Sequence, residues 1–169
     1  KTRFVRKQAR ESDPSGDNYC PVPVRPDWHE PSDLLGYISR LSGQDKYVTT
    51  DVLTFMVQAW RAAAPAADKS GMGEIDLQSI PYWLCLDEMN LAPVEQYFSD
   101  YLSVLESREF SGSSYSCEAL LSSDTLKRLI DTDPALPANL GLDASDGLWQ
   151  FFLHHGISLP PNLIVAGTV

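Results

Sequence analysis

The chain has 169 residues, of which 43% are hydrophobic and 21% are charged. This length and composition suffice for one domain with a buried core, and they exclude disorder throughout the chain. The formal net charge of −10 argues against a broad nucleic-acid-binding surface, because such surfaces are basic.

The sequence also gives no sign of a membrane or extracellular location. No apolar run approaches the roughly 18–20 residues of a membrane-spanning helix, and the amino-terminal residues lack the apolar stretch of a signal peptide. The three cysteines, Cys20, Cys85 and Cys117, form no CxxC pair and predict neither a disulfide framework nor a zinc site. We therefore expect a cytoplasmic protein without a membrane partner.

The first predicted elements are a helix over residues 3–11 and an extended segment over residues 19–24. The helix has an apolar side and a strongly basic side, which we interpret as a solvent-exposed surface. Pro21 and Pro23 interrupt the extended segment, so an edge strand fits better than a central one. The bases of this region are Lys1, Arg3, Arg6, Lys7 and Arg10.

Two helices are predicted next. The first begins near Ser32 and ends near Gly43. The second covers residues 50–64, where apolar residues recur at spacings of three and four, and Thr49 or Thr50 could cap it. Residues 65–73 read as a loop.

The clearest strand of the sequence covers residues 80–86, an apolar run that stops abruptly at Asp87 and Glu88. Such a run is typical of a buried parallel strand whose carboxyl end carries the acids. Residues 93–105 then give the most regular helical pattern of the chain, with proline at its first turn. Residues 110–116 are small and polar and predict a loop.

Two weaker helical patterns follow, over residues 124–130 and 145–154, separated by Pro134 and Pro137. Residues 163–169 predict a buried strand. Strands that alternate with helices indicate a layered α/β fold with a mostly parallel sheet. No repeat or linker divides the chain. Because a charged helix opens the chain and a buried strand closes it, we expect a fragment of a larger protein.

An apolar strand that ends in Asp-Glu has the form of a Walker B element. A rigid buried strand can place the first carboxylate, Asp87, where it holds Mg²⁺ beside nucleotide phosphates. The second carboxylate, Glu88, can then orient and polarise the attacking water. Taken alone, four apolar residues followed by two acids favour an ordinary strand capped by solvated acids.

The wider context favours the catalytic interpretation. Residues 81–107 resemble AAA+ proteins of the McrB type and, less closely, their dynein-related MoxR and midasin-like relatives: an apolar strand, Asp-Glu, a hydrophobic residue, Asn, and a helix ending in a Leu-rich turn. Residues 23–37 are similar to the second-strand region of one McrB-like branch. Residues 160–169 resemble the sensor 1 strand. Lys1-Thr2 resembles the last two residues of a Walker A loop.

This resemblance implies an α/β fold of the P-loop NTPase type: a three-layer parallel sheet with flanking helices, truncated so that the first strand and the carboxyl-terminal lid are missing. Residues 1–169 would form a partial AAA+ core from the end of Walker A to the sensor 1 strand, with residues 111–156 a poorly matched insertion.

The resemblance also implies roles for individual residues. Lys1 and Thr2 would bind the nucleotide, Thr2 and Asp87 would hold Mg²⁺, and Glu88 would activate water. Asn90 would either orient Glu88 or cap the helix that follows. Because the glycine loop is missing, we expect the isolated chain to bind ATP or GTP badly and to be inactive, and the parent protein to hydrolyse the nucleotide.

Family members act as rings, so the resemblance implies a homo-hexamer in the parent. A close likeness to McrB implies DNA restriction, with a nuclease subunit and DNA as partners. A likeness to MoxR or midasin implies protein remodelling instead. From a different class, a non-catalytic α/β scaffold that has lost turnover stays an alternative.

Several other residues have side chains that can take part in binding. His154 and His155 lack acid or cysteine partners at metal-ligand spacing. We expect Arg25 to belong to a structural turn and Trp28 to anchor a core or an interface. In the resembled family the segment after the best helix can face substrate in the ring pore, so residues 107–120 are a candidate partner-contact loop.

Overall fold

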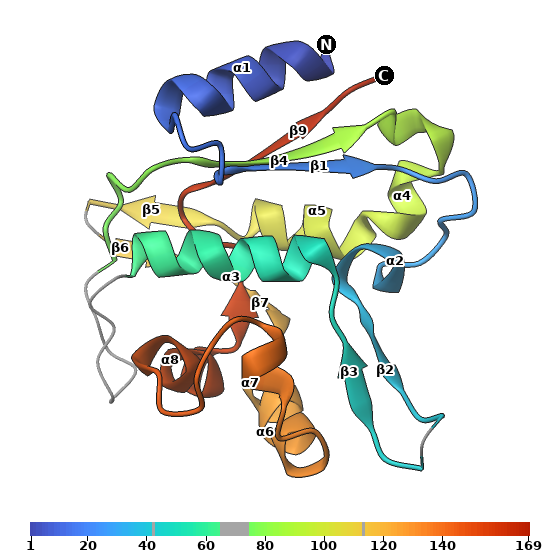
Figure 1. Ribbon diagram of the computed structural model, residues 1–169, viewed down its shortest axis with the longest axis vertical. Coiled ribbons are helices and arrows are strands. Elements are labelled where there is room, and N and C mark those ends of the chain that lie inside the picture. Colours follow the sequence, from blue (N-terminus) through green and yellow to red (C-terminus); the bar gives the residue numbers. More distant parts are fainter. Residues whose placement is uncertain (42, 65–74, 113) are drawn as a thin grey trace.

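The computed structural model describes residues 1–41, 43–64, 75–112 and 114–169 and shows a mixed α/β fold (Figure 1). Its central sheet has three strands in the order β1-β4-β9, all parallel: β1 (Tyr19–Pro23), β4 (Tyr82–Asp87) and β9 (Leu163–Gly167). The parallel sheet is therefore confirmed, and the proline-containing segment is one of its two edge strands. Pro23 lies opposite Asp87, and Leu86 opposite Gly167, so the three carboxyl ends meet at one edge.

Helices cover both faces of this sheet (Figure 1). The predicted amino-terminal helix is confirmed as α1 (Thr2–Ser12), which lies on one face and buries Val5 and Ala9. The other face carries α3 (Asp51–Ala63), α4 (Val94–Tyr97) and α5 (Ser99–Glu106). A three-layer arrangement results, with the main apolar core between the sheet and these last three helices.

Two buried asparagines fix the amino end of β4 to its surroundings. Asn18, just before β1, donates from its side chain to the carbonyls of Ala9 and Pro81. Asn162, just before β9, donates to the carbonyls of Ala59 and Ile80. Their own backbone carbonyls accept from the first two amides of β4. β4 is thus held in register on both sides before it reaches the acids.

The predicted helix over residues 50–64 is confirmed as α3, capped by Thr50, whose hydroxyl accepts from the amide of Leu53. Apolar residues surround this helix because it separates two cores. Phe55 and Met56 belong to the core beneath the sheet. Leu53 and Trp60 belong to a second core, formed with the carboxyl-terminal helices.

That second core confirms the two weaker helical patterns. They correspond to α6 (Ser123–Thr132) and α8 (Gly147–His155), with the short α7 (Leu136–Asn139) between them. A two-residue strand, β8 (Ile157–Ser158), pairs antiparallel with β7 (Ala119–Leu121) and connects this unit to the layer above it (Figure 1).

The predicted helix from Ser32 to near Gly43 is wrong beyond its first turn. Helix α2 (Ser32–Leu35) ends at Gly36, whose φ of 97° carries the chain out of the helix. An antiparallel hairpin of β2 (Tyr37–Ser39) and β3 (Lys46–Val48) follows and projects from the body of the molecule (Figure 1).

Two further predictions need correction, and one lies outside the described residues. The single helix over residues 93–105 is divided into α4 and α5 at Phe98, whose backbone (φ −109°, ψ 1°) leaves the helical conformation. The loop at residues 110–116 contains a hairpin of β5 (Glu109–Ser111) and β6 (Ser114–Ser116). The loop over residues 65–73 lies outside the described residues.

Candidate functional site

Three elements bring oxygen atoms together at the carboxyl edge of the sheet. Thr2, the first residue of α1, donates from its hydroxyl to Oδ1 of Asp87 at 2.5 Å. Thr168, directly after β9, donates to the same oxygen at 2.7 Å. The two hydroxyl oxygens lie 3.4 Å apart. A carboxylate at the end of the central strand is thus held between the residues that begin α1 and follow β9.

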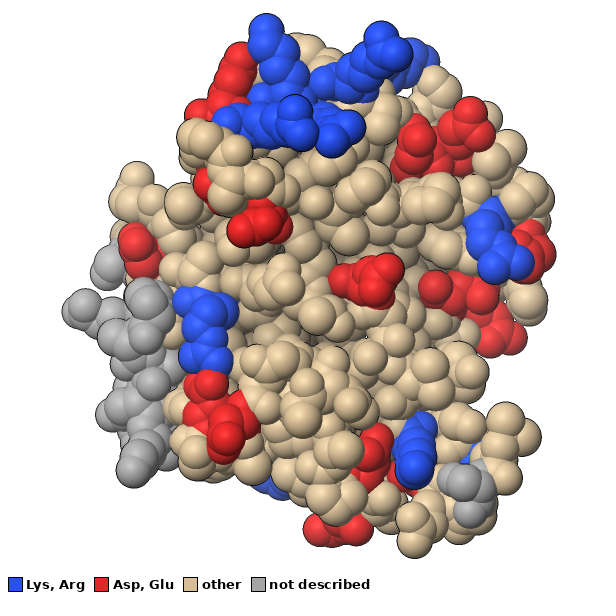
Figure 2. Space-filling view, viewed as in Figure 1, with Lys and Arg blue, Asp and Glu red and all other residues tan. Residues whose placement is uncertain are grey.

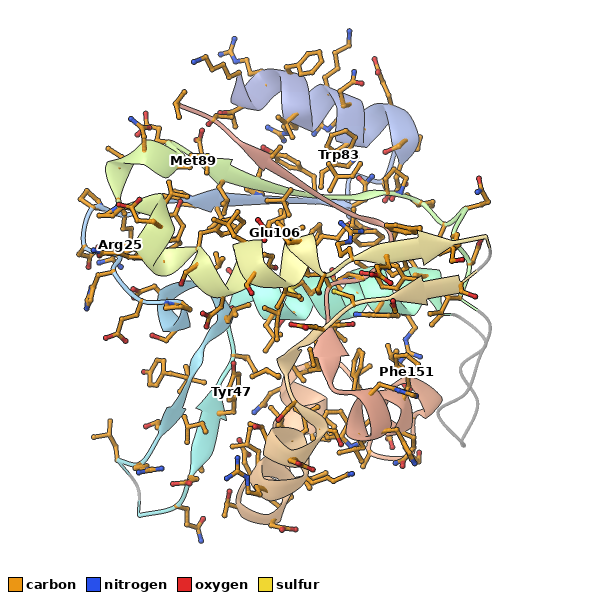
Figure 3. The ribbon with its side chains drawn as sticks, turned by 180° about the vertical axis from the view of Figure 1, so that it is seen from behind. Arg25, Tyr47, Trp83, Met89, Glu106 and Phe151 are labelled. Carbon is orange, nitrogen blue, oxygen red and sulfur yellow. The ribbon has the colours of Figure 1, made fainter. Side chains whose placement is uncertain are left out.

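The position of Asp87 follows from the burial of the strand before it. Leu84, Cys85 and Leu86 are fully buried, whereas Asp87 is half-buried. The strand is therefore anchored in the core along its length, and its last side chain reaches solvent at the sheet edge. Figure 3 shows Met89 at this edge, at the opposite end of β4 from Trp83.

Glu88 is the one residue other than glycine with a positive φ in the described part of the chain (φ 53°, ψ 49°). This left-handed conformation costs about 1–2 kcal/mol for a residue with a Cβ. The amide of Glu88 donates to the Thr168 hydroxyl at 3.2 Å, and the amide of Met89 donates to the Thr168 carbonyl at 2.8 Å. These bonds hold the sharp turn, after which the short helix η1 (Met89–Leu91) begins, and leave the Glu88 carboxylate exposed.

Lys1 lies at the same edge. Its ammonium group is exposed and donates to the carbonyl of Val169 at 2.6 Å. Lys1, Thr2, Asp87 and Glu88 are therefore gathered at one end of the sheet, although residues 2 and 87 are far apart in the sequence.

Asn90 only partly follows the sequence prediction. It is exposed in η1, and its side chain makes no hydrogen bond with any residue that the structure describes, so contact with the Glu88 carboxylate stays a prediction. Its alternative role as a helix cap is wrong, because α4 begins after Pro93 without a side-chain cap.

The two threonine hydroxyls stabilise the ionised form of Asp87. Hydrogen bonds from Thr2 and Thr168 favour the ionised carboxylate and hold the pKa of Asp87 below its usual value. Asp87 therefore carries a full negative charge at neutral pH. Because its folded-state pKa is lowered, its contribution to stability is present above the unfolded value of about 3.9 and is lost as the pH falls through the folded value.

Replacing Thr168 with valine, which has nearly the same shape, should raise the pKa of Asp87, because one of the two donated hydrogen bonds disappears. A carboxyl-detected NMR titration measures this pKa directly. Thr132→Val, at the exposed end of α6, is the matched control and should leave it unchanged. An unaltered Asp87 titration in Thr168→Val would show that this bond does not control the carboxylate.

The oxygen donors at this edge fit Mg²⁺ better than a transition metal. The Thr2 hydroxyl donates its single proton to Asp87, so its lone pairs remain available to bind a cation. Mg²⁺ is commonly held by one or two protein oxygens together with water and phosphate. Within the described ranges, no cluster of three or more His, Cys, Asp or Glu side chains could hold a metal by itself.

Three other residues singled out from the sequence, Arg25, Trp28 and Arg108, make contacts within the described part of the chain. Arg25 forms a bidentate ion pair with Asp27, as expected of a turn. Trp28 packs edge-on against Tyr97 with ring centroids 5.4 Å apart, which confirms an anchoring role. Arg108, in the segment proposed for partner contact, donates to three carbonyls of the chain before and at the start of β9: Leu163, Pro160 and Pro161.

Thr168 is the member of the site that the sequence did not reveal. The sequence signal for Thr168 was its hydroxyl at the end of the second predicted parallel strand. That signal becomes informative when the ends of the two strands are known to lie side by side. Recognising it required the neighbour relation of β4 and β9, since nothing in the local sequence separates Thr168 from an ordinary strand terminus.

The chain matches no known protein-family model and no curated protein. Among the described residues, no helix is both long and apolar enough to cross a membrane.

Proposed function

We propose that this chain is part of a nucleoside-triphosphate hydrolase of the AAA+ type, with its Mg²⁺ site at the carboxyl edge of the sheet. The observation that carries the proposal is the contact between Thr2 and Asp87. In P-loop NTPases the metal is held by a Ser or Thr of the phosphate-binding loop and by the Walker B Asp. The same two residue types meet here: Thr2 at the start of α1 and Asp87 at the end of β4.

The start of α1 supports the same assignment. The amides of its first turn and its dipole create a favourable environment for anions, and α1 begins beside Asp87. Lys1 adds a positive charge at that end of the sheet. On this proposal a glycine-rich loop directly precedes Lys1, and its amides complete the phosphate site.

Each residue then has a defined task. The Thr2 hydroxyl and the ionised Asp87 carboxylate would hold the metal, and Lys1 would bind the β- and γ-phosphates. Bound Mg²⁺ would supply neutralisation of phosphate charge. The exposed Glu88 carboxylate would accept the proton of the attacking water, a role separate from that of Asp87.

The family resemblance extends this proposal to a homo-hexameric ring that uses ATP or GTP. Work on DNA, together with a nuclease subunit, follows from the likeness to McrB. Remodelling of proteins follows from the likeness to MoxR and midasin. A scaffold without turnover has less support, because the acid pair and the Thr2 contact are both intact.

The test uses the protein that includes the residues before Lys1. Asp87→Asn should reduce Mg²⁺-dependent hydrolysis at least a hundredfold, because the metal loses its anionic ligand. Asp124→Asn, an exposed acid in the first turn of α6, is the control and should retain full turnover. Hydrolysis that survives Asp87→Asn, or a sequence before Lys1 that lacks a glycine-rich loop, would overturn the proposal.

A further inference from the structure

A groove of about 470 Å³ runs between α1 and the edge strand β1, and arginines line one side of it. These are Arg3, Arg6 and Arg10, all exposed; Tyr19 and Pro21 of β1 form the opposite side. Figure 2 shows that the largest group of Lys and Arg side chains on this face lies over α1. On a chain with a net charge of −10, such a concentration of positive charge needs a reason.

Folding does not supply that reason. None of the three arginines forms an ion pair with a described residue; the helix has one such pair, between Lys7 and Glu11. Arg6 and Arg10 are four residues apart, where like charges destabilise a helix. The first turn of α1 contains no acid, although the helix dipole favours acids there. Helix formation therefore does not account for Arg3 and Arg6, whereas Arg10 lies in the last turn, where the helix dipole favours a base.

The free edge of β1 excludes one class of ligand. The carbonyl of Asn18 and the amide of Val24 bond to β4, so the backbone N–H and C=O groups of even-numbered residues point to β4 and those of odd-numbered residues point to the free edge. Two of the three outward positions of the strand are Pro21 and Pro23, which have no N–H. An extended acidic peptide therefore cannot pair with this edge as an added strand.

The groove has instead the composition of a single-strand nucleic-acid site. Arginine binds phosphate with two parallel hydrogen bonds, and the row from Arg3 to Arg10 extends about 10 Å along the helix. Tyr19 offers an aromatic ring for base stacking. Burial raises the pKa of Tyr19 to about 12, so its phenol adds no negative charge. A duplex needs a wider basic surface than this acidic chain provides.

We propose that the groove between α1 and β1 binds the phosphate backbone of a single-stranded nucleic acid, with Arg3, Arg6 and Arg10 on the phosphates and Tyr19 against a base. At the far end of the groove, Asp13 and Asp17 flank Ser15 and Gly16. Their negative charge limits the contact to a few nucleotides. The inference does not depend on nucleotide hydrolysis.

The experiment measures fluorescence anisotropy of a labelled oligothymidylate of about 12 nucleotides, a length within the usual site size, with the 169-residue chain. Arg6→Ala/Arg10→Ala should weaken binding at least tenfold at low salt. It should also reduce the slope of log affinity against log salt by about 1.4, because two phosphate contacts are lost. Lys127→Ala/Arg128→Ala removes the same charge from the exposed surface of α6 and should change affinity less than twofold.

Two further comparisons separate this site from a general polyanion surface. Tyr19→Ala should weaken binding about tenfold. Tyr19→Phe keeps the ring and should bind with the affinity of the unmutated chain. Circular dichroism melts establish that each variant is folded. Three results would overturn the inference. The unmutated 169-residue chain would not bind at low salt, the α6 control would weaken binding equally, or polyglutamate would compete as effectively as unlabelled oligonucleotide.

Discussion

On the proposed function, replacing Glu88 with glutamine should stop nucleotide hydrolysis and leave nucleotide binding intact in a protein that carries the proposed phosphate-binding loop. Glutamine has almost the same shape as glutamate but cannot accept a proton from water. The loss of a general base typically lowers the turnover rate by roughly 10²–10⁴-fold. Single-turnover hydrolysis and equilibrium binding of a labelled nucleotide separate the two effects.

The structure indicates that Glu88→Gln should leave the fold of the turn unchanged. The Glu88 side chain is exposed and forms no hydrogen bond or ion pair with any described residue, so the turn does not depend on its charge. The turn is held by backbone amides of Glu88 and Met89 on Thr168, which glutamine retains. Glu95→Gln, an exposed acid in the first turn of α4, is the matched control. Unchanged turnover in Glu88→Gln would remove Glu88 from the mechanism and leave Asp87 as the one assigned acid.

The two acids differ in a way that the sequence pattern predicts and the geometry explains. Asp87 is the last residue of β4, so its side chain is fixed by the strand and by two threonines. Glu88 is the first residue beyond the strand, and its left-handed backbone turns it to solvent. A group that holds a metal needs a fixed position and a low pKa, whereas a group that takes a proton from water needs access to it.

The central part of the fold was predictable because its signals are local and strong. An apolar run ending in two acids predicted β4, and apolar spacing of three and four predicted α3. The grouping of Thr2 with Asp87 was predictable only through the motif resemblance, since the contact joins residues 85 positions apart. Thr168 was missed because its role depends on which strands are neighbours.

The hairpins show where sequence patterns were insufficient. Residues 37–48 contain strands of three residues each, too short for alternation to be distinguished from helical spacing. Gly36 was the available signal: a helix often ends at a glycine with positive φ, and this glycine comes directly after the last α2 residue. The strands β5 and β6 are likewise three residues long, and none of their residues is buried.

Trp60→Ala should give the largest loss of stability of any alanine substitution in α3. Trp60 is 1% exposed, packs against Phe151, Phe152 and Tyr115, and donates from Nε1 to the carbonyl of Ser158 at 2.7 Å. Truncation of a buried tryptophan costs about 3–5 kcal/mol from lost burial and the cavity left behind. For a chain of this size that corresponds to a fall in melting temperature of about 10 °C or more.

The same variant tests whether the molecule folds as one unit. Trp60 belongs to the second core, which α3 forms with α6 and α8. Phe55 and Met56, also in α3, belong to the core between α3 and the sheet. Because one rigid helix contributes to both cores, Trp60→Ala should shift a single cooperative transition measured both by circular dichroism and by the titrating Asp87 carboxyl. Phe110→Ala, an aromatic residue that is 56% exposed, should cost less than about 1 kcal/mol. Two separate transitions, with the sheet edge intact after the α6–α8 unit has melted, would show that α3 does not couple the second core to the site.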